Sequence, residues 1–159
     1  MITILRNELS KQLTCKRGDF LENLSYLLIK SSRFLKGALD RRLQEYDVTA
    51  TQFSVLNQIS YKNGNITSAE VADRLESDRP TISGVINRLE KSGLVEKVDN
   101  PNDKRSVYLK LNQQTLELVD EIRDVSDQVN RDIFETLTES EASNMKEYLL
   151  KLMKRVDQI

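Results

Sequence analysis

The 159-residue sequence predicts a mainly α-helical fold with one short β-hairpin in its second half. Two observations favour helices. Glycine and proline are scarce, at 5 and 2 residues, and apolar residues recur three, four or seven positions apart along most of the chain. A third observation places the hairpin near residues 94–111, where apolar and polar residues alternate. With 38% apolar residues, the chain is long enough for one ordinary domain with a core.

The first predicted helix covers residues 19–46 and ends near Tyr46 and Asp47. A single apolar stripe runs along it, made of Leu21, Leu24, Leu28, Leu35, Leu39 and Leu43. Such a stripe is typical of a helix that packs against a core, and we adopt that interpretation for most of these positions.

Two short helices follow, and each opens with a capping box, in which the cap side chain and the residue three positions later bond each other's backbone. Thr49 and Gln52 form the first box, and Thr67 and Glu70 form the second. Asn63-Gly64 ends the first of these helices. The residues predicted to face inward are Phe53, Leu56, Ile59, Val71 and Leu75.

A third short helix begins after Ser77 or Asp78, either of which is a good cap, and has Pro80 in its first turn. Gly93 supplies its C-terminal stop. Its predicted apolar face consists of Ile82, Val85, Ile86 and Leu89.

The predicted hairpin follows at once, and its polar turn contains two adjacent basic residues. Its return strand has apolar residues at alternate positions, Val107, Leu109 and Leu111. Two helices close the chain, one over residues 113–137 and one that opens with the capping box Thr138 and Glu141. Their apolar stripes contain Leu116, Val119, Ile122, Val129, Ile133 and Leu137, and then Met145, Leu149, Leu152 and Val156.

Three short helices followed by a basic hairpin make up a winged helix-turn-helix with a two-stranded wing, here flanked by long N- and C-terminal helices. The third helix of a winged helix-turn-helix fits the major groove of B-DNA. Small polar side chains and free backbone N–H groups at its N-terminus suit base edges or phosphates. The candidate DNA-binding residues on this helix are Arg79, Pro80, Thr81, Ser83, Asn87 and Arg88.

These candidates have structural alternatives. Ser77 and Asp78 are interpreted as helix caps in preference to base contacts. Pro80 suits the geometry of a first helical turn, and Arg88 can equally be a solvated surface residue. Asn87 is a candidate for pairing with adenine only if it faces outward.

The stretch "SAEVADRLESDRPTISGVINRLEKSGLVEKVDNPNDKRSVYLKL" resembles the MarR family of bacterial transcription regulators. The family's wing pattern, Asp-x-Arg-x-x-x-Leu/Ile, stands here as Asp103, Arg105 and Leu109. The resemblance implies a homodimer that binds double-stranded DNA at inverted repeats, most often as a repressor. It also implies that the third short helix enters the major groove and the wing enters the minor groove.

No repeats, low-complexity tracts or linkers appear, so the sequence predicts a single domain over residues 1–159, in which the resemblance implies the following division. Its reading head would cover about residues 49–111. Interlocking dimerisation helices would cover about residues 15–46 and 113–159. Family members often bind small aromatic or phenolic effectors between the dimer helices and the reading head, but no distinctive set of residues marks such a pocket here.

The wing would place a cation in the narrow, electronegative minor groove. Asp103 is expected to hold the Arg105 guanidinium by a bidentate contact. Lys104 at the tip would contact a phosphate, and Leu109 would pin the strand to the core. The alternative is that Asp103 and Arg105 only close the hairpin through a surface salt bridge, worth roughly 0–1 kcal/mol.

Composition excludes several other classes. Histidine is absent, cysteine occurs once, and no phosphate-binding or nucleophile motif is present, so we expect no enzyme activity, metal or other cofactor. No membrane partner is expected, because no run of about 18 apolar residues exists. The single cysteine and the lack of a signal-peptide pattern favour the cytoplasm.

The net charge of −1 conceals an uneven distribution. Residues 74–111 carry eight basic and six acidic side chains, whereas residues 112–159 carry six basic and eleven acidic ones. A phosphate-binding face needs only local positive charge, so the overall balance does not argue against nucleic acid.

Two alternatives stay open. Ser25 stands where a peroxide-sensing branch of the family has a cysteine, and Cys15 is interpreted as incidental in preference to a redox role. A winged-helix module that binds protein and not DNA is the competing function. This function is disfavoured by the presence of Arg88, Lys104 and Arg105, because a module that does not bind DNA does not require these basic side chains.

Overall fold

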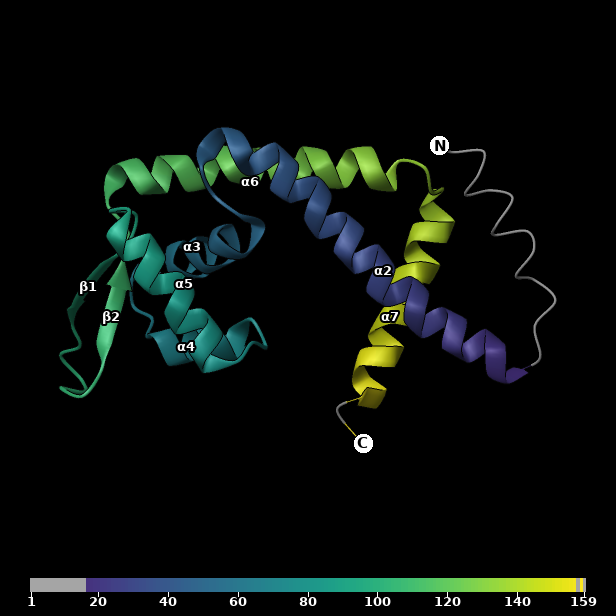
Figure 1. The fold of residues 1–159 in the computed structure, drawn as a ribbon, viewed down its shortest axis with the longest axis horizontal. Helices are drawn as coiled ribbons and strands as arrows, with labels where there is room; N and C mark the ends of the chain where they lie inside the picture. Colours follow the sequence, from purple (N-terminus) through teal and green to yellow (C-terminus); the bar gives the residue numbers. More distant parts are fainter. Residues whose placement is uncertain (1–16, 157, 159) are drawn as a thin grey trace. The chain divides into compact units, whose positions relative to one another are not determined.

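The computed structural model describes residues 17–156 and residue 158, with only the backbone described for residues 17–22. Cys15 and the side chain of Leu21 therefore lie outside the described part. The chain divides into two compact units, one ending at Ala38 and the other beginning at Leu39. Helices and one two-stranded hairpin make up the described part of the chain (Figure 1), which confirms the predicted fold class. None of the described helices combines the length and the hydropathy that a membrane crossing requires.

The long N-terminal helix α2 spans Arg17–Leu43 and is followed by the 3-10 helix η1, Gln44–Tyr46. The sequence predicted one continuous helix to residue 46, so its last turn differs from the prediction. The reason is local: Asp47 has a left-handed φ of 53°, and its N–H donates to the Gln44 carbonyl oxygen. This tighter bond pattern is common where a helix ends.

Among the described side chains of the α2 stripe, full burial is confined to the C-terminal end of the helix. Leu43 is fully buried, and Leu39 packs partly against the core. Leu24 and Leu28 are exposed, so the prediction that most of the stripe packs against a core is wrong for them. The large exposed apolar side chains of this helix, among those described, are Leu24, Tyr26, Leu27, Leu28, Ile29 and Phe34.

Three short helices build the head of the second unit: α3 (Ala50–Tyr61), α4 (Ser68–Arg74) and α5 (Arg79–Lys91). The two predicted capping boxes are confirmed. The Gln52 N–H donates to the Thr49 hydroxyl oxygen, and the Thr49 N–H donates back to the Gln52 side chain. Thr67 and Glu70 repeat the arrangement. Hydrogen bonds from the Thr67 backbone and hydroxyl hold the pKa of Glu70 below its ordinary value.

The hairpin consists of β1, Glu96–Asp99, and β2, Val107–Lys110, paired antiparallel. Leu109 is fully buried, as predicted. Its N–H donates to the Ile66 carbonyl oxygen at 2.9 Å, so β2 is also tied to the segment between α3 and α4. The hairpin is therefore held to the helices by both packing and a backbone bond.

Gly64 permits this close approach between the α3–α4 turn and β2. Its φ is +73°, a left-handed conformation that side chains disfavour. A Cβ atom there would lie 2.8 Å from Cγ of Lys110. Gly64 is therefore needed for packing against β2 as well as for ending α3, as predicted from Asn63-Gly64.

The core of the second unit lies between the short helices, the hairpin and α6. The predicted inward face of α5 is confirmed, since all four of its apolar residues are buried. The largest fully buried side chains are Leu43, Leu56, Ile59, Ile66, Ile82, Ile86, Leu89, Leu109 and Ile122. One core therefore fixes α5 and β2 with respect to each other.

Helices α6, Gln113–Phe134, and α7, Glu139–Val156, close the chain. The first starts at the head and leads away from it (Figure 1). Asn112 caps α6, and the predicted box of Thr138 and Glu141 opens α7. No side chain of α7 is buried. Its large exposed apolar residues are Met145, Tyr148, Leu150, Leu152, Met153 and Val156.

Candidate nucleic-acid interface

The N-terminus of α5 is fixed by Asp78 and not by Ser77. The Thr81 N–H donates to the Asp78 carboxylate at 2.8 Å. Hydrogen bonds from the Thr81 hydroxyl and backbone lower the pKa of Asp78 from its ordinary value. The capping interpretation of Asp78 is therefore confirmed.

The other candidates in the first half of α5 lie on its exposed surface. The Arg79 guanidinium lies 3.5 Å from the Asp73 carboxylate of α4, in a pair with both side chains mostly exposed. Pro80 stands in the first turn, as its geometry favours. Ser83 is exposed and hydrogen-bonds no side chain in the part of the chain that the structure describes.

The second half of α5 presents Asn87 and Arg88, both exposed. Asn87 faces outward, as its DNA-binding interpretation required, but its side chain has a partner. The Lys97 ammonium of β1 donates to Asn87 Oδ1 at 3.0 Å and to Glu90 Oε2 at 2.6 Å. Arg88 makes no ion pair or side-chain hydrogen bond with any described residue.

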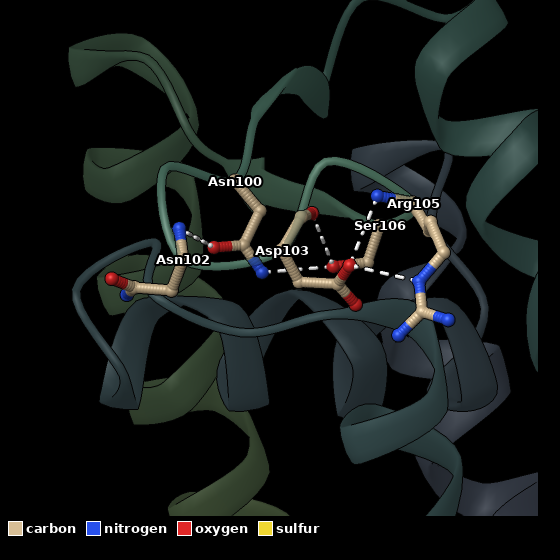
Figure 2. Close-up of polar contacts among 5 residues, drawn as sticks. All are labelled: Asn100, Asn102, Asp103, Arg105 and Ser106. Carbon is tan, nitrogen blue, oxygen red and sulfur yellow. Dashed lines mark hydrogen bonds and ion pairs between the residues drawn. The ribbon is translucent and has the colours of Figure 1, made fainter.

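A buried asparagine organises the loop between the strands. Asn100 is only 7% exposed. Its amide nitrogen donates to the Ser106 hydroxyl at 2.8 Å, and its carbonyl oxygen accepts from the Asn102 N–H at 2.9 Å (Figure 2). The Ser106 hydroxyl in turn donates to the Asp103 carbonyl oxygen. A satisfied buried polar group of this kind holds a loop in one conformation.

Arg105 is displayed by that loop, with 93% of its side chain exposed. Asp103 Oδ1 accepts from the Arg105 backbone N–H at 3.0 Å and from its Nε at 3.3 Å (Figure 2). The predicted partnership is confirmed, but the predicted bidentate contact is wrong. The two residues are separated by one position in a tight turn, so one carboxylate oxygen bonds both the backbone and the side chain of Arg105.

The electrostatics of the tip follow from this turn. Hydrogen bonds from the backbone and then the side chain of Arg105 lower the pKa of Asp103, with a smaller contribution from Ser106. Asp103 is therefore ionised at neutral pH, while the terminal nitrogens of Arg105 bond no described residue. Lys104 is exposed and has no ion-pair partner among the residues described here. The tip thus presents two cations to solvent.

The structure brings the candidates together in two groups, one along α5 and one at the wing tip. Sequence reasoning missed the residues that connect and shape these groups. Lys97 links β1 to α5, and Asn100 and Ser106 shape the tip. The role of Asn100 could have been predicted from its position before a proline, because an asparagine in a turn commonly hydrogen-bonds the nearby backbone.

Comparisons with known proteins agree with this geometry. A family model described as MarR family matches residues 46–106. The chain is 31% identical to the HTH-type transcriptional regulator FarR of Neisseria gonorrhoeae, over 72% of this chain and 78% of that protein. It is 35% identical to the multiple antibiotic resistance protein MarR of Salmonella typhimurium, over 70% of this chain and 80% of that protein.

A solved structure also resembles the chain. A mutant of the E. coli MarR protein in complex with operator DNA superimposes with a TM-score of 0.77 at 28% identity. The match covers 87% of this chain and 99% of that one. The matched part therefore includes helices outside the reading head, because the three short helices and the hairpin alone make up a much smaller share of the chain.

Proposed function

The chain belongs to the MarR family of DNA-binding transcription regulators, and we propose that it is a ligand-responsive repressor that binds inverted-repeat operators as a homodimer. Members of this family are transcription regulators and not enzymes. The observation that carries the proposal is the exposed Arg105, held by Asp103 at the tip of a hairpin that shares one core with α5. A helix and a basic wing in fixed relation suit adjacent major and minor grooves.

The proposed contacts divide by task. The α5 residues Arg79, Ser83, Asn87 and Arg88 would face the major groove, where Arg and Asn side chains reach base edges or phosphates. Pro80 and Thr81 would act by shaping the first turn of the helix and its cap. At the wing, Arg105 would enter the minor groove, Asp103 would orient it and Lys104 would contact a phosphate.

The proposed homodimer rests on the unburied apolar surfaces of α2 and α7. Each helix exposes six large apolar residues among those described, and α7 buries none of its side chains. Exposed apolar surface on this scale marks an interaction site. A protein that binds a two-fold symmetric DNA site requires a second copy of itself as its partner. We propose residues 15–46 and 113–159 as its dimerisation helices and residues 49–111 as its reading head.

The effector is proposed from family resemblance alone. It would be a small aromatic or phenolic molecule that binds one conformation of the dimer better than another and so changes operator affinity.

Selection of bound sequences from a random DNA pool tests the function. We expect enrichment of an inverted repeat, because a two-fold dimer imposes its symmetry on the site. The half-site centres should lie about one helical turn, ~34 Å, apart. Failure to retain DNA or heparin at low salt would favour the protein-binding module instead. Enrichment of a site without a dyad would contradict the dimeric arrangement.

Arg88→Ala tests the phosphate-contact interpretation of this residue. If Arg88 contacts a phosphate, the variant should bind all sequences less tightly and by nearly the same factor. The slope of log affinity against log salt concentration should fall by about 0.9 for each lost contact. Titration at several salt concentrations measures it. An unchanged slope, together with an unchanged melting temperature, would show that Arg88 is a solvated surface residue and not a phosphate contact.

A further inference from the structure

We propose that Lys97 fixes the orientation of the Asn87 side chain, so that Asn87 reads a hydrogen-bond acceptor, guanine above all, and not adenine. This inference rests on the proposed function, because it requires α5 to lie in the major groove. It makes Asn87 a specificity-determining residue and Lys97 its positioning residue.

The contact itself determines which amide atom faces Lys97. The Lys97 ammonium lies 3.0 Å from the Asn87 side chain, on the atom assigned as Oδ1. An ammonium group has three donors and no acceptor. The carbonyl oxygen must therefore face Lys97, because the amide nitrogen is also only a donor. This chemistry removes the usual ambiguity between the two ends of an asparagine amide.

Glu90 holds Lys97 in this position. Its carboxylate lies 2.6 Å from the Lys97 ammonium, and Glu90 and Asn87 stand three positions apart on one face of α5. The pair is less exposed than the other ion pairs of the head, with 33% of the Lys97 side chain and 41% of the Glu90 side chain exposed. Lys97 is thus bound by two acceptors of α5 and does not extend toward a phosphate.

The orientation has a consequence for base recognition. An asparagine that reads adenine uses both ends of its amide, accepting from N6 and donating to N7. Here the oxygen is directed toward Lys97 and the wing, which leaves the amide nitrogen as the group available to DNA. Guanine offers two adjacent acceptors, O6 and N7, in the major groove, whereas the N6 amino group of adenine would oppose a second donor.

Removing the lysine should restore the other preference. In Lys97→Met the side chain keeps its length and apolar stem but cannot donate, so the Asn87 amide is free to rotate. Random-pool selection should then show, at one base pair per half-site, guanine for the wild type and adenine for Lys97→Met. The change in relative affinity should be roughly 5- to 150-fold, the range of one good base contact. Asn87→Ala should lose the preference at that base pair.

Lys91→Met is the matched control. Lys91 is an exposed lysine of the same helix and lies outside the proposed contacts, so its removal should leave the base preference unchanged. Thermal melting of all variants verifies folding. Guanine preference retained in Lys97→Met would overturn the inference, as would a preference unaltered by Asn87→Ala, and in both cases the proposed function would stand. A wild-type protein that enriches no sequence would instead overturn the proposed function and the inference with it.

Discussion

Arg105→Ala is expected to lower operator affinity by roughly 5- to 150-fold per subunit, which corresponds to about 1–3 kcal/mol for one lost DNA contact. The thermal melting temperature should be nearly unchanged. Both expectations follow from position, since the side chain is 93% exposed and its only described partner is Asp103. The loss should be largest on operators with A·T-rich flanks, whose narrow minor groove concentrates negative potential.

Two neighbouring variants separate the roles within the wing. Asp103→Ala should reproduce the defect at smaller size, because it removes the orienting carboxylate and leaves the cation. Lys104→Ala should act mainly through the salt dependence, lowering its slope by about 0.9 per phosphate. Titrations on operators that differ only in their flanks, together with melting curves, measure all three variants.

A different pattern of results would favour the surface salt bridge. In that case Arg105→Ala would have a small effect on stability, on the order of 0–1 kcal/mol, and Asp103→Ala, which also removes the acceptor of the Arg105 backbone N–H, a larger one, with little effect of either on DNA affinity. A loss of affinity that is equal on A·T-rich and G·C-rich flanks would contradict insertion of Arg105 into the minor groove.

Leu152→Glu is expected to separate the proposed dimer and to reduce operator affinity by about 10²–10⁴-fold, because the two heads would bind their half-sites separately and lose the gain from joint binding. Leu152 is 51% exposed on an α7 that buries no side chain within the chain. A carboxylate there would have to be desolvated in an apolar contact between copies. Sedimentation at micromolar concentration measures assembly.

Ser140→Glu provides the matched control. It introduces the same carboxylate into the same helix, on the polar side that carries Glu147, Lys151 and Lys154, away from the exposed apolar residues. We expect it to leave assembly and operator affinity unchanged. If Leu152→Glu were still dimeric and bound the operator normally, α7 would not form the dimer surface.

Local features of the fold were predicted well because they depend on neighbours in sequence. All three capping boxes formed as predicted, since each needs only a side chain and a backbone three residues apart. The inward face of α5 followed from its spacing. The end of α6 was less accurate: it lies at Phe134 and not at residue 137, because the Leu137 N–H donates to the Phe134 carbonyl oxygen in a turn that precedes the next cap.

Contacts between elements were less accessible to sequence reasoning. The link from Lys97 to Asn87 and Glu90 joins residues ten and seven positions apart on different elements, and no residue pattern indicates it. The role of Asn100 depends on burial, which composition alone does not assign to an asparagine. The single-oxygen contact of Asp103 required the turn geometry. The assignment of individual residues to DNA stays a prediction.

The unburied apolar faces of α2 and α7 have a genetic consequence. In the proposed dimer, subunits made in one cell pair with each other before they reach DNA. Equal amounts of wild-type and Arg105→Ala chains would give about a quarter wild-type pairs and about half mixed pairs, by random assortment of two-fold partners. Mixed pairs bring only one intact wing to an inverted repeat, so an Arg105→Ala allele should be partly dominant. A Leu152→Glu chain is expected not to pair, so its allele should be recessive.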